Sequence, residues 1–240
     1  MLLTVDIGNT SISFGVFKGK RLLRSWKVLT NPAISGKLVK LPAAGIDRAI
    51  ISSVVPKATP VIKGTIARKY GIRPLVLGEN IKAPIRNLYR KPRQVGQDRL
   101  VDAVAVKEIY GYPAIVVDFG TAITFDVISG RGEYLGGLIF PGIETSLNAL
   151  SEKAALLPKI TVVPPKGLVG RDTVDSMRSG VFYGIGSLCD GIISKLRKKY
   201  GTVRVIATGG HAEIVAKFSS AVKRIDPYLT LRGLRIIAKY

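Results

Sequence analysis

The sequence predicts an α/β protein built from two related halves, and three observations lead to this prediction. First, the strand-like opening "LTVDIGNTSISFGV" is similar to "VVDFGTAITFDV" at residues 116–127. Second, the aligned residues Asp6 and Asp118 stand about half of the chain apart, as expected of a duplicated unit. Third, strand patterns and helix patterns follow each copy in mixed order, which is typical of α/β proteins.

In the first half, apolar and β-branched runs separated by glycine turns predict three successive antiparallel strands. A further strand and a helix that Gly71 ends come next, followed by the short strand "PLVLG" and a second helix. Residues 31–45 are broken by glycine and proline, and no element is assigned to them. The expected strands are 2–7, 11–17, 21–28 and 48–55, and the expected helices are 57–70 and 97–110.

The second half repeats the three-strand pattern and then adds helices. The longest is expected over 172–199, because apolar residues recur along it with the period of a helix. The other expected helices are 142–156, 211–219 and one that begins near 230, and the expected strands are 114–119, 122–128, 133–140 and "VRVIA".

The boundary between the halves is expected where Gly111 and Pro113 stop a helix. A chain of 240 residues is long enough for one large domain or two small ones. The expected domains are therefore residues 1–111 and 112–240.

Composition restricts the class of protein. The chain is 47% hydrophobic and 22% charged, as in ordinary globular proteins. A single cysteine, Cys189, excludes a disulfide framework and fits a reducing cytoplasm, and a single histidine, His211, argues against a His-built metal site. No segment reaches the roughly 20 apolar residues of a membrane helix, and no basic leader precedes the first strand. A cytoplasmic protein without a membrane partner is expected.

The chain is strongly basic, because 37 Lys and Arg against 16 Asp and Glu give a net charge of +21. Such a charge permits binding to nucleic acid or to another acidic surface. The basic residues are scattered, however, and neither aromatic interleaving nor zinc-finger spacing accompanies them. A solvated basic surface without a specific nucleic-acid partner is the favoured interpretation.

The repeated motif places a glycine turn with hydroxyl side chains directly after a buried strand. Gly8 and Gly120 let backbone N–H groups approach an anion, and nearby Ser and Thr residues add hydroxyl donors. Asp6 and Asp118 cannot donate to an anion, so their expected partner is a cation or water that touches phosphate. A single Asp-x-Gly turn is more often structural. Two such loops, one in each half, predict a cleft that holds a nucleotide polyphosphate with its metal.

Eight segments of the chain carry a resemblance to a known family. They are "DIGNT" (6–10), "SSVVP" (52–56), "YRKPRQVGQDR" (89–99), "DFGTAITFD" (118–126), "GGLIFPG" (136–142), "GRDTVDSMRSG" (170–180), "TGG" (208–210) and "DPYLTLRGL" (226–234). Any one of them is modest, but the ordered set is specific. It resembles the type III pantothenate kinases over essentially the whole chain. That family is part of the actin, Hsp70 and sugar-kinase superfamily of ATPases, whose members are built from two ribonuclease H-like halves.

The resemblance implies a kinase that uses ATP to phosphorylate pantothenate to 4′-phosphopantothenate, the first step of coenzyme A biosynthesis. It implies ATP with Mg²⁺ in the cleft between the halves, a monovalent cation, K⁺ or NH₄⁺, at Asp118, and a homodimer, for which the apolar stripe of the long helix offers a surface. The implied ATP-binding residues are Asp6, Ile7, Gly8, Asn9, Thr10, Ser11, Ile12, Ser13 and Thr121, and the implied substrate-binding residues are Tyr89, Gly96, Gln97, Asp98, Arg99 and Thr173.

Asp98 is the candidate catalytic residue. Its spacing alone fits equally a helix-start carboxylate, which the helix dipole stabilises by about 0.3–1 kcal/mol, and a general base. The resemblance implies that it is also the general base that takes the proton from the primary hydroxyl of pantothenate. The two roles are compatible, because a stabilised carboxylate stays ionised. Asp126, which also fits a residue that closes its hairpin, and Asp172 are the alternative bases.

Other candidate residues have structural interpretations beside the functional ones. Tyr89 fits a half-buried packing residue, and Thr173 fits the N-cap of the long helix. "TGG" fits an ordinary turn from strand to helix, with contact to adenosine as the functional alternative. Cys189 fits a small core residue.

Two other classes of function remain as alternatives. A non-catalytic regulator or nucleic-acid binder on the same fold is favoured by the charge, but the intact residues Asp6, Asp98, Asp118 and Thr121 oppose it. A kinase of another hydroxy acid is also open, because the shape of the pocket decides the substrate. Lys153, at a place where the family commonly has threonine, is the departure that bears most directly on the edge of the site.

Overall fold

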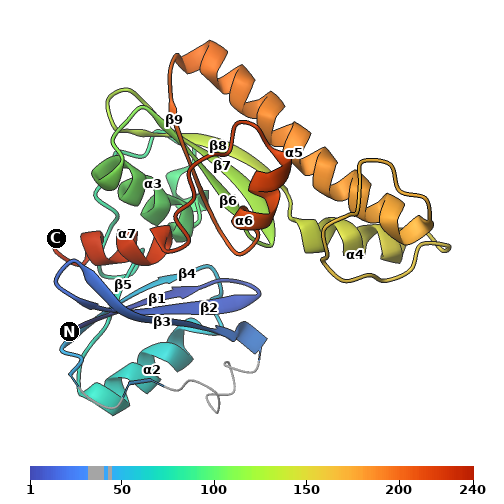
Figure 1. Ribbon diagram of the computed structural model, residues 1–240. Helices are drawn as coiled ribbons and strands as arrows, with labels where there is room; N and C mark the ends of the chain where they lie inside the picture. The colour runs from blue at the N-terminus through green and yellow to red at the C-terminus, as the bar shows by residue number, and fades with distance from the viewer. Residues whose placement is uncertain (32–40, 43–44) are drawn as a thin grey trace. The chain divides into compact units, whose positions relative to one another are not determined.

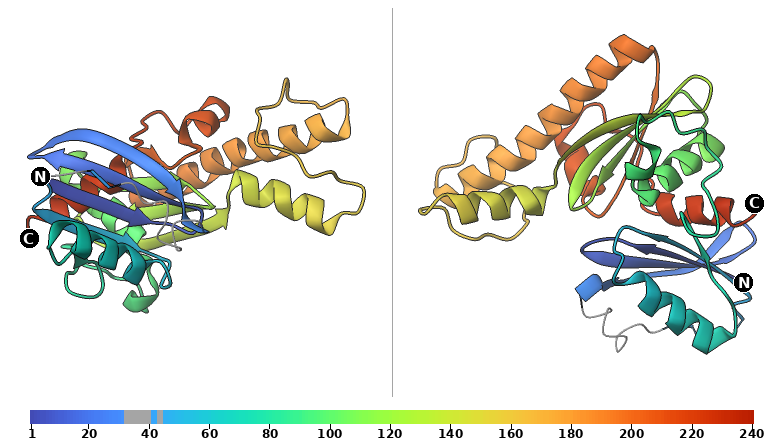
Figure 2. Two further views of the ribbon diagram at one scale, coloured as in Figure 1. Left: turned by 90° about the horizontal axis from the view of Figure 1, so that it is seen from below. Right: turned by 180° about the vertical axis from the view of Figure 1, so that it is seen from behind.

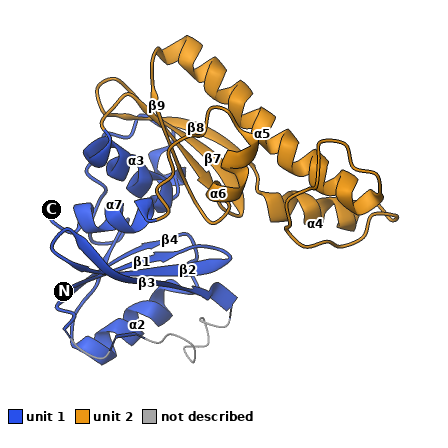
Figure 3. Ribbon diagram, in the orientation of Figure 1, with its two compact units in different colours: residues 1–110, 228–240 blue, residues 111–227 orange. Residues whose placement is uncertain are grey.

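The computed structural model forms two compact units, which Figure 3 shows in separate colours. The first unit comprises residues 1–110 and 228–240, and the second comprises residues 111–227. The structure describes residues 1–31, 41–42 and 45–240, so the unassigned segment 31–45 lies largely outside the described residues.

The C-terminal segment corrects the expected domain organisation. The sequence predicts that residues 112–240 form the second domain, whereas helix α7 (Leu229–Ile237) belongs to the first unit and packs against α3 (Gln97–Ile109). A side-chain carbon at Gly233 would lie 2.5 Å from the carbonyl oxygen of Val101, so this glycine lets the two helices approach closely. Packing between segments so distant in the chain leaves no local signal in the sequence.

The first unit contains a five-stranded mixed sheet with strand order β3-β2-β1-β4-β5 (Figure 1). The first three strands form the expected antiparallel meander, whereas β4 runs parallel to β1 and β5 parallel to β4. The strands are β1 (Leu2–Ile7), β2 (Ser11–Lys18), β3 (Arg21–Leu29), β4 (Arg48–Ser53) and β5 (Leu75–Val76).

Side chains alternate between the two faces of this sheet. One face carries Leu3 and Val5 of β1 and packs against α2 (Thr59–Tyr70). The other carries Ile50 of β4 and packs against α3 and α7, which Figures 1 and 3 show on the side of the sheet opposite α2. Asp6 alternates with Val5 along β1, so it projects on the face that carries α3.

The second unit repeats this architecture with a four-stranded sheet of order β8-β7-β6-β9. Again the first three strands form an antiparallel meander, and β9 runs parallel to β6. The repetition predicted from the two Asp-x-Gly motifs is therefore present in the strands themselves. The strands are β6 (Ala114–Phe119), β7 (Ala122–Ile128), β8 (Tyr134–Pro141) and β9 (Arg204–Thr208).

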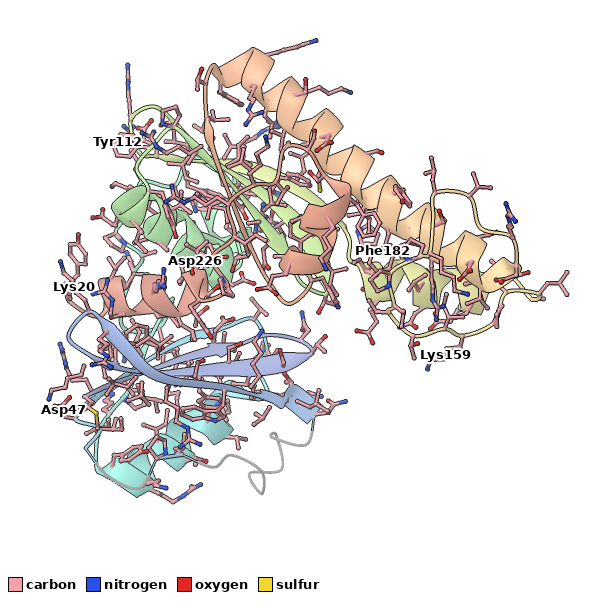
Figure 4. The ribbon with its side chains drawn as sticks, in the orientation of Figure 1. Lys20, Asp47, Tyr112, Lys159, Phe182 and Asp226 are labelled. Carbon is pink, nitrogen blue, oxygen red and sulfur yellow. The ribbon has the colours of Figure 1, made fainter. Side chains whose placement is uncertain are left out.

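The long helix α5 (Thr173–Tyr200) buries its apolar stripe within its own unit. Met177 and Ile185 lie in the core that also contains the strand residues Val117 and Phe125. Phe182, labelled in Figure 4, packs against the ring of Phe218 with ring centres 5.3 Å apart. The expectation that this stripe offers a dimer surface is therefore wrong, because the stripe already covers the sheet.

Cys189 is part of the same core, as the sequence suggests. Burial, with the nearby Asp190 carboxylate, raises the pKa of its thiol to about 12. The thiol therefore stays protonated at neutral pH, and Cys189 has no nucleophilic role.

The remaining helices agree with the sequence to within a few residues, with one exception. The segment expected to be helical over 211–219 is split into the short helix α6 (Ala212–Val215) and the 3₁₀ turn η2 (Ala216–Phe218). Helix α4 (Ile143–Lys153) follows β8, and the 3₁₀ turn η1 (Pro92–Gln94) precedes α3. Among the described residues, no helix combines the length and the apolar character that crossing a membrane requires.

Asp190 on α5 fastens the turn at 219–221 to that helix. Its carboxylate accepts hydrogen bonds from the hydroxyl and N–H groups of Ser219, Ser220 and Ala221, at 2.5–2.9 Å. Burial opposes ionisation of the carboxyl, but the hydrogen bonds from these residues outweigh it and lower the pKa of Asp190. Because the folded-state pKa lies below the unfolded one, the carboxylate contributes stability above the unfolded pKa, and this contribution is lost as the pH falls through the folded-state pKa.

We expect Asp190→Asn to lower the free energy of unfolding at pH 7 by about 1.5–3 kcal/mol, as for hydrogen bonds to a charged group. The difference from wild type should shrink as the pH falls below about 4, because the carboxyl is then protonated first in the unfolded state and, at lower pH, in the folded state as well. Urea denaturation at pH 7 and pH 3 measures both effects, with the exposed Glu152→Gln as the matched charge change. A loss of stability that does not depend on pH would contradict this assignment.

Candidate functional site

The first glycine loop is a tight turn between β1 and β2. The N–H of Gly8 donates to the carbonyl of Ser11 (3.0 Å), and a side-chain carbon at Gly8 would lie 3.1 Å from that oxygen. Asn9 and Thr10 are exposed at the tip of the turn. Backbone groups are therefore presented at the end of a rigid strand, as an anion-binding loop requires.

Asp6 lies in a row of polar side chains across the end of the first sheet. It is paired with Ser13 of β2 and with Ser52 of β4, and directly paired residues project on the same face of a sheet. Ser52 is fully buried, and its Oγ has no hydrogen-bond partner among the described residues. The next pair, Ile7 and Ile12, projects on the opposite face and is buried in the core. These two residues anchor the base of the loop in the core and do not project on the face that carries Asp6, Ser13 and Ser52.

Asp98 is the second residue of α3, on the sheet face that carries Asp6. Its half-buried carboxylate accepts a hydrogen bond from the N–H of Arg99 (2.8 Å). A side-chain carbon at Gly96 would collide with this carboxylate and would lie 3.6 Å from Val54, the residue that follows β4. Glycine therefore lets the start of the helix press against the end of the strand. The structure brings Asp98 and Asp6 to one face and one end of the same sheet.

The rest of the substrate segment lies in the first unit as well. The Gln97 side chain packs on the turn at Gly78, where a side-chain carbon would lie 3.4 Å from its Cδ. Arg99 is half-buried at the third position of α3. Tyr89 is half-buried, and its N–H donates to the Asn87 side chain (3.0 Å). Thr173, by contrast, belongs to the second unit.

The second glycine loop, between β6 and β7, has the construction of the first. The N–H of Gly120 donates to the carbonyl of Ala122 (3.1 Å), and Thr121 is exposed at the tip. Asp118 is paired with Thr124 of β7 and with Thr208 of β9. A carboxylate flanked by hydroxyl groups thus stands at the end of this sheet too.

The "TGG" turn packs directly on the strand of Asp118. Gly209 has a φ of 95°, and a side-chain carbon there would collide with the Asp118 carboxylate and lie 2.6 Å from the backbone of Phe119. The N–H of His211 donates to the Phe119 carbonyl (3.2 Å), whereas Gly210 faces open space. An ordinary turn from strand to helix does not need its backbone this close to a neighbouring strand. The close contact of Gly209 with Asp118 and Phe119 therefore indicates that the turn helps to shape the surroundings of the Asp118 carboxylate.

Both alternative bases have structural partners. Asp126 is buried and accepts hydrogen bonds from the hydroxyl of Tyr134 (2.7 Å) and from Thr124 (3.0 Å). Asp172 is the N-cap of α5, and its carboxylate accepts from the N–H of Asp175 (2.8 Å). The prediction that Thr173 is the N-cap is therefore wrong, because the carboxylate one residue earlier satisfies the free N–H and Thr173 becomes the first helical residue.

Thr173 lines a pocket of about 610 Å³ at the start of α5. The pocket is shallow and widely open to solvent, so its volume alone does not identify a ligand site. The loop 154–172 is held beside it, because the hydroxyl of Ser179 donates to the carbonyls of Gly167 (3.1 Å) and Leu168. Figure 2 shows this loop next to α4 and the first turns of α5. The residues that line the pocket are Leu157, Gly170, Arg171, Asp172, Thr173, Ser176 and Met177.

Asp6 and Asp118 are the residues that could contribute to a cation site. Among the described residues, no three or more His, Cys, Asp or Glu side chains gather in a group that could hold a metal. Each of the two carboxylates is instead accompanied by hydroxyl oxygens from the neighbouring strands. A few oxygen donors fit a hard cation such as Mg²⁺, which usually takes most of its ligands from phosphate and water.

Comparison with known proteins decides the family. The family model described as type III pantothenate kinase matches residues 2–195, which is most of the chain. The chain belongs to the type III pantothenate kinase family. A type III pantothenate kinase from Geobacter sulfurreducens is 42% identical over 249 aligned residues, which cover 99% of this chain and 98% of the relative. One from Myxococcus xanthus is 43% identical over 249 residues, covering 99% and 97%.

Solved structures similar to this family member confirm the expected actin-like ATPase fold. A Baf family protein from Campylobacter jejuni has a TM-score of 0.64 and 23% identity, covering 99% of this chain and 97% of that one. A ROK family glucokinase from Streptomyces griseus, in complex with glucose and AMPPNP, has a TM-score of 0.56 and 15% identity, covering 99% and 100%. At these identities the likeness concerns the fold alone.

Sequence patterns do not reveal every residue of the site in this pantothenate kinase family member. Ser52 stands in the family segment "SSVVP", which has no charge chemistry, and only the pairing of β4 with β1 places its hydroxyl beside Asp6. Thr30 also has no signal, although it forms two hydrogen bonds with the first glycine loop. Both depend on contacts between segments that lie far apart in the chain.

Proposed function

We propose that this protein transfers the γ-phosphoryl group of ATP to the primary hydroxyl of pantothenate, forming 4′-phosphopantothenate and ADP. This is the first step of coenzyme A biosynthesis. The observation that carries the proposal is full-length similarity, because relatives named type III pantothenate kinase are 42% identical over 99% of the chain. The positions of four candidate residues support it as well. Asp6 and Asp118 lie near the ends of β1 and β6. Asp98 lies at the start of α3, and Thr121 lies at the tip of the second glycine loop.

In this proposal the two glycine loops bind ATP, and the segment before α3 binds pantothenate. Gly8, Asn9, Thr10, Ser11 and Thr121 contact the phosphates through N–H and hydroxyl groups. Asp6 would reach them through a bound cation, and Ile7, Ile12 and Ser13 support the loop from the paired strands. Asp98 accepts the proton of the pantothenate hydroxyl as its oxygen bonds to the γ-phosphorus and the bond to ADP breaks. Arg99 is suited to the substrate carboxylate, because a guanidinium can bind a carboxylate through two parallel hydrogen bonds. Tyr89, Gly96, Gln97 and Thr173 complete the proposed substrate residues.

Mg²⁺ bound together with ATP would neutralise the charge on the phosphates. Asp6 would reach it through its carboxylate, in the row that also carries Ser52. Asp118 would hold a monovalent cation, K⁺ or NH₄⁺, by its carboxylate oxygens. The single cysteine, buried and free, favours the cytoplasm as the compartment of the enzyme.

A direct test measures ADP release from ATP with pantothenate and with analogues, and identifies the product by mass. We expect turnover with pantothenate and a product one phosphate heavier. Turnover only with another hydroxy acid would favour the alternative kinase. No turnover with any of them, together with sequence-selective nucleic-acid binding at moderate salt, would favour the regulator.

The assignment of Asp118 to a monovalent cation predicts a salt dependence. Activity should need a divalent ion and should be higher in K⁺ or NH₄⁺ than in Na⁺ at equal ionic strength. Asp118→Asn should remove this preference, because it removes the charge that binds the cation. Initial rates in the three chloride salts measure the effect. Equal rates in all three would contradict the cation assignment but not the proposed kinase activity.

We further infer a homodimer, on grounds that differ from those in the sequence. β8 is the edge strand of the second sheet, and Leu138, Ile139 and Phe140 on it are all exposed, Ile139 by 65%. In the loop 154–172, Leu156 is 93% exposed and Val169 82%. An apolar strand edge left in water is an aggregation hazard that a second copy would cover.

Light scattering at micromolar concentration should therefore give the mass of a dimer. Ile139→Asp should produce a monomer, because it places a charge on the apolar edge. Leu23→Asp is the matched control, since Leu23 is an exposed apolar residue on the edge strand of the other sheet. A monomeric wild-type protein would count against the inference.

A further inference from the structure

Thr30, which directly follows β3, is bonded to the first glycine loop at two points. Its hydroxyl donates to the carbonyl of Gly8 (2.6 Å), and its backbone N–H donates to the carbonyl of Thr10 (3.0 Å). Thr30 is buried, although Asn9 and Thr10 at the tip of the loop are exposed. One buried residue therefore holds carbonyl groups on either side of Asn9.

The second glycine loop is held in a similar way by residues that follow β8. The N–H of Gly142 donates to the carbonyl of Thr121 (3.0 Å), and the hydroxyl of Thr145 donates to the same carbonyl (2.7 Å). A side-chain carbon at Gly142 would collide with the Gly120 carbonyl and lie 2.7 Å from that of Thr121. Glycine is thus required for the start of α4 to reach the loop.

These contacts occupy equivalent places in the two units. Thr10 and Thr121 align in the repeated motif, and the carbonyl of each accepts a hydrogen bond from the residue that follows the third strand of its meander. The hydroxyl groups come from different positions: Thr30 itself in the first unit and Thr145, in the first turn of α4, in the second. The same restraint, reached with different residues, indicates that each loop needs a hydroxyl donor to hold its shape.

We propose that Thr30 and Thr145 are positioning residues whose hydroxyl groups fix the two glycine loops in the conformation that binds ATP. The peptide unit is planar, and in its trans form the carbonyl and the following N–H point in opposite directions. Holding the Gly8 carbonyl therefore directs the N–H of Asn9, and holding the Thr121 carbonyl directs the N–H of Ala122. Both N–H groups then point away from the threonine that holds the carbonyl. An anion-binding loop needs its N–H groups directed outward in this way.

This inference rests on the proposed use of ATP, so its test measures ATP binding directly. Thr30→Val and Thr145→Val keep the shape of the side chain and remove the hydroxyl, whereas Thr30→Ser and Thr145→Ser keep the hydroxyl. Calorimetry with ATP and Mg²⁺ should show the Kd of each Val variant raised about three- to tenfold, the worth of one neutral hydrogen bond. The Ser variants should stay within about twofold of wild type, well inside that effect.

Thr65→Val provides a matched control in the first unit. The hydroxyl of Thr65 donates to the carbonyl of Val61 (2.8 Å) within α2, which packs on the sheet face opposite the one that carries Asp98. Its loss removes the same type of hydrogen bond away from the glycine loops. The Kd for ATP should be unchanged, and the KM for pantothenate should be unchanged in all five variants.

The outcomes separate this inference from the proposed function. Val variants that bind ATP as tightly as wild type, or Ser variants as weak as the Val variants, would overturn it. If Thr30→Val does not fold, the exposed Thr145 decides the matter alone. A wild-type protein that binds ATP without phosphorylating pantothenate would refute the proposed reaction, and the Kd values of the variants would still test the positioning roles. A wild-type protein that binds no ATP would overturn both the reaction and the positioning roles.

Discussion

Asp98→Asn is expected to lower kcat about 100-fold while it leaves the KM for ATP nearly unchanged. General-base contributions are typically about 10²- to 10⁴-fold. The lower end applies because the transition state of phosphoryl transfer is loose and needs little help from a base. An asparagine oxygen can still accept the hydrogen bond from the Arg99 N–H (2.8 Å), so the start of α3 should keep its structure. The loss should appear in kcat, as it does for an interaction used only in the transition state.

Steady-state rates with both substrates varied measure this effect, and melting temperatures check that the variant is folded. Glu108→Gln is the matched control, because Glu108 is an exposed carboxylate near the other end of α3. It makes the same change of charge on the same helix and should leave kcat unchanged. A kcat for Asp98→Asn within about threefold of wild type would be far below a general-base effect and would leave Asp98 as a helix-start residue. Asp126 and Asp172 are weak replacements, since both are engaged in structural hydrogen bonds.

The sequence was sufficient to predict the strands around both glycine loops, because their signals are local. β1 and β6 begin and end at the predicted residues, and each is followed by a glycine turn and an alternating strand. A duplicated motif adds a second constraint, since the pattern of one copy supports the interpretation of the other. Asp98 at the start of α3 was predictable for the same reason, because a glycine before a helical pattern marks the helix start.

Contacts between distant segments could not be predicted in this way. α7 packs against α3 through Gly233, and nothing within residues 228–240 indicates the unit to which they belong. Ser52 stands beside Asp6 only because β4 pairs with β1 in one register, and Thr30 reaches the first glycine loop only through the pairing of β3 with β2. The N-cap of α5 was misplaced by one residue because Asp172 and Thr173 are both suitable caps, and only the backbone decides between them.

Gly209→Ala is expected to destabilise the second unit by about 2–5 kcal/mol and to abolish most of the activity. Two costs add at this position. A φ of 95° is unfavourable for any residue with a side-chain carbon, at about 1–2 kcal/mol. The added methyl group would also collide with the Asp118 carboxylate and lie 2.6 Å from backbone atoms of Phe119, and overpacking of this kind costs about 1–3 kcal/mol. Relief requires that the "TGG" turn and the strand of Asp118 move apart, so the proposed cation site should be lost even in protein that remains folded.

The neighbouring glycine provides the control. Gly210 has no atom within 4 Å of the place that a side-chain carbon would occupy, and its φ is not positive, so Gly210→Ala should change the free energy of unfolding by less than about 0.5 kcal/mol. Urea denaturation of the two variants, with initial rates in K⁺ and Na⁺ salts, measures stability and the cation response together. Equal behaviour of the two variants would show that the turn does not press on Asp118 in solution. A Gly209→Ala protein that is destabilised but still prefers K⁺ would separate the packing of the turn from the cation site and place the cation away from Asp118.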